Sequence, residues 1–282
     1  MRFVSYIAGG HAGYGLCDGR DVYALAPRLG PQYPDLRALL AGGGLAAVAR
    51  AIRGATADLH VDEISFLPPI PQPVKILCIG LNYEEHRVET ARPKSLHPTV
   101  FTRFADTQVG HRGALVKPRH SDKMDYEGEL AVVIGKAGRD IDAADALAHV
   151  AGFACYQDAS IRDFQGHTTQ FTPGKNFPAT GGFGPWLTTP DEAGPIGAQR
   201  LRTTLNGTVM QEARLGEMIF PIERLIAYLS SWTPLAPGDV IATGTPGGVG
   251  MKRVPPVWLE DGDEVVVEID GVGTLSNPVV AE

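Results

Sequence analysis

The pattern of apolar and polar residues changes along the chain and divides it into two parts. In the first part, Arg2–Tyr6 and Asp21–Leu25 have the composition of short strands, and a turn at Asp18–Gly19 lies between them. Leu36–Ile52 carries apolar residues at helical spacing, interrupted by Gly42–Gly44. These features predict a small N-terminal domain over residues 1–70.

The boundary is predicted at Leu67–Pro73, where four of seven residues are proline and neither a helix nor a central strand can continue. After it, residues 71–282 contain longer apolar runs that are typical of buried strands, and one segment with apolar residues at helical spacing. The predicted strands are Val74–Ile79, Leu130–Gly135, Val150–Tyr156, Asp239–Ala242 and Glu264–Ile269, and the predicted helix is Ile222–Ser230.

The predicted strands outnumber the helices and do not alternate with them regularly. This pattern argues against a doubly wound parallel sheet. It favours an α+β fold that is mostly β, with residues 71–282 as the larger, chemically active domain.

Composition and charge exclude several classes of partner. The chain has 282 residues, 44% of them hydrophobic, and a net charge of −7 with no basic run, so we expect no binding to nucleic acid or to an anionic membrane. The longest apolar stretches are too short to span a membrane, and no signal peptide is expected. Cys17, Cys78 and Cys155 form no CxxC pair, which is typical of reduced thiols in a cytoplasmic protein.

Acidic residues gather where two of these strands begin or end. Asp125, Glu127 and Glu129 alternate, so a strand would place them on one face, and the same segment then becomes apolar. Asp158 follows the strand that ends at Tyr156. Because paired carboxylates beside a core require a compensating charge, we predict that Glu127, Glu129 and Asp158 bind a hard divalent cation: Mg²⁺, Mn²⁺ or Ca²⁺. The alternative is an ordinary edge strand with a solvated acidic face.

Further polar residues follow at defined spacing. Asp158, Arg162 and Gln165 would share one face of a helix, where the arginine and the amide could bind carboxylate and carbonyl oxygens of a substrate. Lys175, in the turn-rich segment Phe171–Pro178, could stabilise developing negative charge. The alternatives are a surface ion pair and a solvated loop lysine.

Two more motifs have a chemical interpretation. His86 and Glu89 lie three residues apart in a segment of helical character, so the carboxylate could orient the imidazole as a general base. The loop Ala242–Gly250 offers backbone N–H groups and the Thr245 hydroxyl to a carboxylate, and it lacks the glycine spacing of a dinucleotide site. The alternatives are a polar surface turn and a flexible glycine-rich connection.

Taken in order, these motifs resemble those of the fumarylacetoacetate hydrolase family over roughly residues 74–280. The segments that carry the resemblance are Gly80–Tyr83 before His86, Tyr126–Leu130, Asp158–Gln165, Gly174–Phe177, Gly184–Trp186 and Gly244–Gly250.

The resemblance implies a mixed β-roll or sandwich, a variable N-terminal domain and a homodimer. It also implies roles for individual residues. Mg²⁺ or a similar ion would be held by the three carboxylates, water would be activated by the His–Glu pair, and substrate would be contacted by Arg162, Gln165, Lys175 and Thr245.

Two positions depart from that family. Ile79 stands where the founding hydrolase has a fourth metal carboxylate, which resembles the smaller bacterial acylpyruvate-hydrolase type. Arg103 lies in the strand after the His–Glu motif, where relatives often have lysine.

The first hypothesis for function is hydrolysis of a C–C bond in an acylpyruvate or a related 1,3-dicarbonyl 2-oxo acid, as in aromatic catabolism. The second is decarboxylation or tautomerisation of oxaloacetate, or hydration or isomerisation of a 2-oxo acid, by similar metal-assisted chemistry. The third is a non-catalytic module that is stabilised by its metal. His86 and Glu89 favour an enzyme over the third hypothesis.

Overall fold

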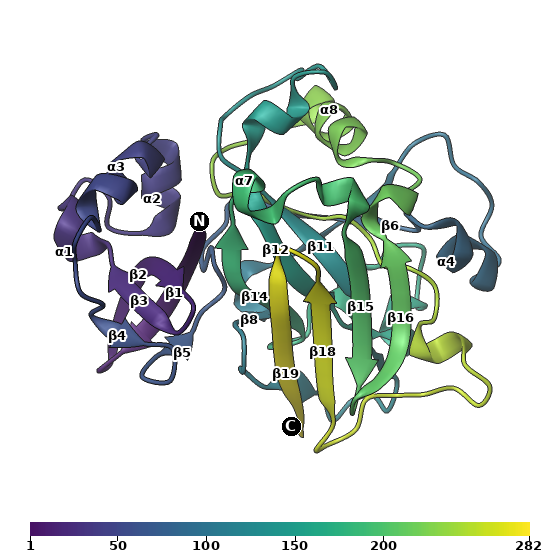
Figure 1. The fold of residues 1–282 in the computed structure, drawn as a ribbon. Helices are drawn as coiled ribbons and strands as arrows, with labels where there is room; N and C mark the ends of the chain where they lie inside the picture. The colour runs from purple at the N-terminus through teal and green to yellow at the C-terminus, as the bar shows by residue number, and fades with distance from the viewer.

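The computed structural model describes residues 1–282 and is built mainly from strands, as Figure 1 shows. One sheet has 12 strands and a second has five, and a two-stranded ribbon lies beside them. The mostly β, α+β fold class that the sequence predicts is confirmed.

The large sheet runs in the order β4-β3-β2-β1-β14-β12-β11-β17-β6-β7, with β5 on β1 and β8 on β14. Its strands are β1 (Arg2–Ala8), β2 (His11–Asp18), β3 (Asp21–Ala24), β4 (Leu59–His60), β5 (Ser65–Phe66), β6 (Ile76–Gly80), β7 (Thr99–Arg103), β8 (Gln108–Val109), β11 (Gly128–Ile134), β12 (Val150–Asp158), β14 (Gly181–Thr188) and β17 (Val240–Ala242).

The second sheet runs in the order β16-β15-β18-β19-β9, and the ribbon pairs β10 with β13. Their strands are β9 (Leu115–Lys117), β10 (Met124–Asp125), β13 (Ser160–Ile161), β15 (Arg200–Leu205), β16 (Thr208–Arg214), β18 (Glu264–Ile269) and β19 (Gly273–Ala281).

The helices are short. They are α1 (Ala26–Leu29), α2 (Leu36–Ala41), α3 (Leu45–Ala51), α4 (Glu84–Glu89), α5 (Arg162–Gln165), α6 (Thr172–Lys175), α7 (Pro190–Ala193) and α8 (Ile222–Trp232), with 3₁₀ turns η1 (Ala105–Thr107), η2 (Ala146–His149), η3 (Ile196–Ala198), η4 (Leu215–Glu217) and η5 (Gly250–Lys252). None of the helices is long and apolar enough to cross a membrane.

The apolar run Leu130–Ile134 of β11 is explained by the packing on its two faces. Leu130, Val132 and Ile134 point into a core that is shared with the second sheet and α8. Ala131 and Val133 point the other way, into a core shared with β1 and α2. Because both faces of the strand are covered from Leu130 to Ile134, apolar side chains are favoured at every position of this run.

The N-terminal unit is joined to the rest of the large sheet through one strand pair. β1 pairs with β14, with Phe3 opposite Leu187. Residues between β5 and β6, where the prolines cluster, form neither helix nor strand. The domain boundary near residue 70 stays a prediction, because a single sheet continues across it (Figure 1).

Two details of the N-terminal prediction are corrected. An additional strand, β2, lies between the two expected ones, so the turn at Asp18–Gly19 joins β2 to β3 instead of β1 to β3. The helical segment is divided into α2 and α3 at the predicted glycines. Gly43 has a φ of 64°, which an L-residue with a side chain rarely adopts, so the helix ends there.

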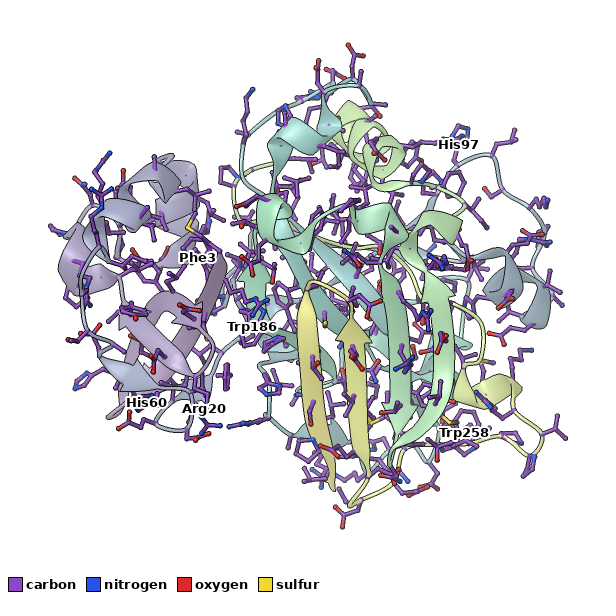
Figure 2. All side chains as sticks on the ribbon, in the orientation of Figure 1. Phe3, Arg20, His60, His97, Trp186 and Trp258 are labelled. Atoms are coloured by element: carbon purple, nitrogen blue, oxygen red, sulfur yellow. The ribbon has the colours of Figure 1, made fainter.

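Side chains at the boundary between the two parts link them further. Figure 2 shows Trp186 there; its indole N–H donates to the Val272 carbonyl at 2.8 Å, and the Arg2 guanidinium lies 5.5 Å from its ring centre. His111 packs edge-on against Phe66 with ring centres 4.9 Å apart, and its Nδ1 accepts a hydrogen bond from the Ser276 N–H at 3.0 Å.

Burial and, secondarily, the neighbouring Arg112 lower the pKa of His111 from 6.5 to about 4. The unfolded chain therefore takes up a proton at this residue before the folded protein does, and folding stability falls as pH decreases from about 6.5 through 4. We expect His111→Asn, which keeps an acceptor but cannot titrate, to flatten the pH dependence of the unfolding free energy in this window. Chemical denaturation at several pH values measures it. The exposed His120→Asn is the control, and equal slopes in all three proteins would contradict the expectation.

Candidate active site and metal centre

Three predicted carboxylates meet because of the register between β11 and β12. The two strands are antiparallel, with Gly128 opposite Gln157 and Glu129 opposite Tyr156, so the beginning of one lies beside the end of the other. Glu127, Glu129 and Asp158 each offer an oxygen within 4.8 Å of the others. All three residues are at least 96% buried, so the predicted alternative of a solvated acidic face is wrong for this cluster.

The expectation of one unbroken strand through Asp125, Glu127 and Glu129 is wrong. The chain leaves β10 at Asp125 and enters β11 only at Gly128. Between them, the Glu127 N–H donates to the side-chain oxygen of Gln157 at 2.6 Å instead of to a backbone carbonyl. Asp125 accepts hydrogen bonds from Arg162, whose guanidinium also pairs with Glu127, and from the N–H groups of Gly250 and Met251.

The predicted helix from Asp158 to Gln165 is also corrected. β12 extends to Asp158, Ser160–Ile161 pairs with β10, and α5 begins only at Arg162. Arg162 and Gln165 nevertheless lie together, with Arg162 donating to the Gln165 side-chain oxygen at 3.0 Å. Arg162 and Gln165 are therefore close together as predicted, although the chain reaches them through the end of β12, the short strand β13 and one turn of helix instead of one continuous helix.

Buried cations compensate most of this acidic cluster. Lys175 Nζ donates to Glu127 Oε2 at 2.5 Å and to Asp158 Oδ2 at 2.6 Å, and Arg162 pairs with Glu127 Oε1 at 2.7 Å. Burial opposes ionisation of Glu127, but the charges of Arg162 and Lys175 more than offset it and lower its pKa to about 2. The predicted alternatives of a surface ion pair and a solvated lysine are wrong for residues this deeply enclosed.

Arg103 is a further site residue, which the sequence singled out only as a departure from the family and without a role. Its side chain is fully buried and donates to Asp158 Oδ1 at 2.8 Å and to Thr180 at 2.7 Å. The signal in the sequence was an arginine at the end of a strand whose other residues are uncharged. It holds one of the predicted ligands in place.

Glu129 is the one carboxylate of the four that has no cationic partner. Asp125, Glu127 and Asp158 all form ion pairs, whereas Glu129 accepts a hydrogen bond only from the Gly244 N–H at 2.8 Å. Burial, and then the charges of Asp158 and Glu127, raise its pKa well above 4.5. An all-oxygen donor set that has one uncompensated carboxylate fits a hard divalent cation.

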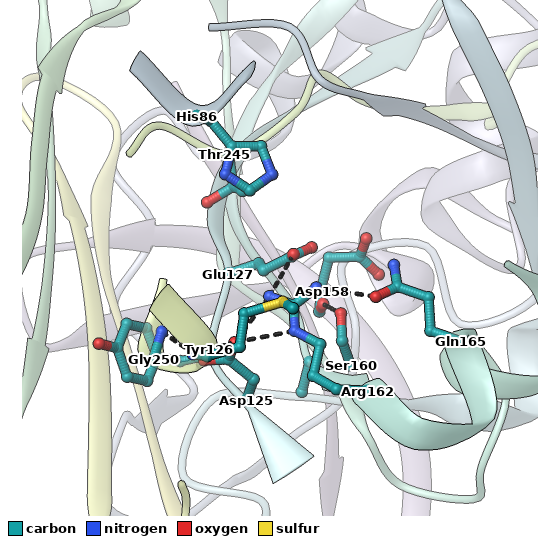
Figure 3. Close-up of polar contacts among 12 residues, drawn as sticks. His86, Asp125, Tyr126, Glu127, Asp158, Ser160, Arg162, Gln165, Thr245 and Gly250 are labelled. Atoms are coloured by element: carbon teal, nitrogen blue, oxygen red, sulfur yellow. Dashed lines mark hydrogen bonds and ion pairs between the residues drawn. The ribbon is translucent and has the colours of Figure 1, made fainter. Parts of the chain in front are cut away.

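His86 and Glu89 lie on α4 on the other side of the cavity. His86 Nδ1 is 2.7 Å from Glu89 Oε1, and the Gly248 N–H donates to Glu89 Oε2 at 3.0 Å. Figure 3 shows the imidazole facing Glu127 across the open space. The carboxylate thus fixes one ring nitrogen and leaves Nε2 for chemistry, the arrangement of a general base.

The cavity has a volume of about 480 Å³ and is lined by every predicted site residue except Glu89 and Asp158. Thr245 borders it, but its hydroxyl already donates to the Gly128 carbonyl at 3.0 Å and accepts from Gln211 at 2.7 Å. The N–H groups of the glycine loop likewise bind the protein's own Glu129 and Glu89. This loop therefore positions carboxylates of the site, and direct substrate binding by Thr245 stays a prediction.

Comparison with known proteins gives consistent results. Residues 75–280 match the family model of the fumarylacetoacetate (FAA) hydrolase C-terminal domain. The human mitochondrial oxaloacetate tautomerase FAHD2A is 39% identical over 289 aligned residues, which cover 99% of this chain and 92% of the human protein.

Two solved structures are similar over the whole chain. Fumarylacetoacetate hydrolase from Exiguobacterium antarcticum is 31% identical with a TM-score of 0.83, and each chain is covered completely. Maleylpyruvate hydrolase from Sphingobium sp. SYK-6, in complex with manganese(II) and pyruvate, is 28% identical with a TM-score of 0.83, covering 100% of this chain and 99% of the other.

Because Glu129 has no cationic partner, replacing it should affect metal binding more than folding. Glu129→Gln keeps an acceptor for the Gly244 N–H and removes the uncompensated charge. We expect the variant to melt at the same temperature as the unmodified protein or above it in the presence of EDTA, and to lose most of the thermal stabilisation that Mn²⁺ or Mg²⁺ provides. Thermal melts with and without metal measure both effects. The exposed Glu268→Gln is the control; full metal stabilisation in Glu129→Gln would show that the cluster has been misinterpreted.

Proposed function

Because the chain belongs to the fumarylacetoacetate hydrolase family, we propose that it is a divalent-metal-dependent enzyme that interconverts the keto and enol forms of a 2-oxo acid. The observation that carries the proposal is the buried carboxylate cluster facing the His86–Glu89 pair. The full-length similarity to an oxaloacetate tautomerase supports tautomerisation as the first candidate reaction, with oxaloacetate as the first substrate to test.

Glu127, Glu129 and Asp158 would hold the cation. When bound, Mg²⁺ or Mn²⁺ supplies Lewis-acid charge to the oxygens of the 2-oxo acid. Manganese is a reasonable first choice, because a similar solved structure contains it together with pyruvate. The carboxylate cluster thereby defines the end of the cavity at which the 2-oxo group binds.

His86 would move the proton. In the keto-to-enol direction, Nε2 would take a proton from C3, the electrons of the broken C3–H bond would form the C2–C3 double bond, and the π electrons of the C2 carbonyl would move onto its oxygen. That oxygen would then take a proton from solvent, and the His86 imidazolium would release its proton to solvent. Glu89 accepts the Nδ1 hydrogen bond and stabilises the imidazolium that forms. Gln165, which borders the same cavity, would donate a hydrogen bond to the negatively charged C2 oxygen, and Arg162 would orient Gln165. Lys175 would hold Glu127 and Asp158 in position.

C–C bond hydrolysis is the second candidate. The same imidazole could deprotonate a water molecule that attacks the distal carbonyl of an acylpyruvate, and a similar solved structure is a maleylpyruvate hydrolase. The two reactions differ in whether His86 faces a C–H group or a water. Assays of oxaloacetate tautomerisation and of acetylpyruvate cleavage on one preparation separate them, and turnover of neither would support the non-catalytic alternative.

Other expectations remain predictions. A homodimer is expected from the family, and a cytoplasmic location from the reduced cysteines, although the human relative is named as mitochondrial. The substrate is expected to be a small molecule, as in the related enzymes.

His86→Gln tests the division between metal binding and proton transfer. We expect kcat to fall by about 10²–10⁴-fold, the usual contribution of a positioned general base. Stabilisation by Mn²⁺ should not change, because His86 is not among the proposed ligands. Steady-state kinetics and thermal melts measure the two effects. An unchanged kcat for the reaction that the protein catalyses would remove His86 from the mechanism.

A further inference from the structure

Four basic side chains border the inner cavity, and they fall into two pairs. Arg162 and Lys175 are buried and bound to carboxylates of the metal cluster. Arg92 and Lys252 are exposed, form no ion pair and donate no side-chain hydrogen bond within the protein. The positive charge that is free to meet a ligand therefore lies at the rim of the cavity, away from the floor.

The backbone of Arg92 is held in a defined place. Its N–H donates to the Arg87 carbonyl at 3.0 Å, and the Ala91 N–H donates to the Val88 carbonyl at 3.0 Å, which together close α4. Ala91 adopts a φ of 55°, a left-handed conformation that is unfavourable for an alanine. The Arg87 side chain also donates to the Arg92 carbonyl, so only the guanidinium of Arg92 is left unbound.

The backbone beside Lys252 is also held in place. It ends η5, and the two preceding N–H groups, of Gly250 and Met251, donate to Asp125 at 2.8 and 3.0 Å. Asp125 is itself bound to Arg162. The backbone that carries Lys252 is thus connected to the floor of the site by two hydrogen bonds.

A second cavity of about 730 Å³ adjoins the first and shares Arg92 with it. The other basic side chains that border this outer cavity include Arg87 and Lys94, and both pair with Glu84. Arg92 is therefore the uncompensated cation at the junction between the two spaces.

We infer that Arg92 and Lys252 bind the second carboxylate of a 2-oxo dicarboxylic acid, and that this contact makes the enzyme selective for dianionic substrates. The inference rests on the proposed function, which places the 2-oxo end of the substrate at the carboxylate cluster. A substrate with a neutral distal group gains nothing from the two cations. A dicarboxylate gains a charge-assisted hydrogen bond from each.

The test compares two inert oxalyl ligands in the presence of Mn²⁺. N-oxalylglycine has an oxalyl end and a distal carboxylate, and oxamate has the oxalyl end alone. Isothermal titration calorimetry gives Kd for both with the unmodified protein, Arg92→Met, Lys252→Met and the double variant. Lys136→Met removes an equal charge at an exposed position beyond the far end of β11 and is the matched control.

We expect N-oxalylglycine to bind the unmodified protein more tightly than oxamate, and each substitution to weaken it roughly tenfold. Oxamate affinity should stay within about twofold in every variant, which also shows that the variants are folded. Unchanged N-oxalylglycine affinity, or equal losses for both ligands, would overturn the inference and leave the proposed function intact. Absence of binding of either ligand to the unmodified protein, together with no turnover of oxaloacetate or acetylpyruvate, would overturn both.

Discussion

Burial of four carboxylates in one place is the constraint on which the site depends. Asp125, Glu127, Glu129 and Asp158 are at least 96% buried, and ions removed from water in this way are costly unless they are paired. Three buried cations meet them, and these come from separate elements: Arg103 from β7, Arg162 from α5 and Lys175 from α6. The ion pairs thereby hold the ends of several strands and helices together, and one negative charge remains for a bound cation.

This arrangement separates the rigid part of the site from the part that carries the base. Glu129 and Asp158 lie on β11 and β12 in the middle of the large sheet, and Glu127 immediately precedes β11. His86, by contrast, lies on the short helix α4, in which it is the only buried residue. Hydrogen bonds from Gly244 to Glu129 and from Gly248 to Glu89 connect both parts to one loop. A change in that loop would therefore alter metal binding and proton transfer together.

Much of this could be predicted from local sequence, and the reasons for the errors are physical. Alternation identified Glu127 and Glu129, and the end of an apolar run identified Asp158, because strand periodicity depends only on neighbouring residues. The break before Gly128 could not be predicted, since it is stabilised by the distant Gln157 side chain. The role of Arg103 could not be predicted for the same reason, since its partner, Asp158, lies 55 residues away in the sequence. The choice between tautomerisation and C–C bond hydrolysis depends on how the substrate lies in the cavity, and the amino-acid sequence does not specify that.

The central claim is that the buried cluster holds a divalent cation. Anomalous X-ray diffraction at the manganese edge, on crystals grown with Mn²⁺ and oxalate, tests it directly. The account predicts one strong anomalous peak about 2.1 Å from oxygens of Glu127, Glu129 and Asp158, with oxalate on the side of the metal that faces His86. A peak at another place, or no peak at the cluster, would contradict this claim.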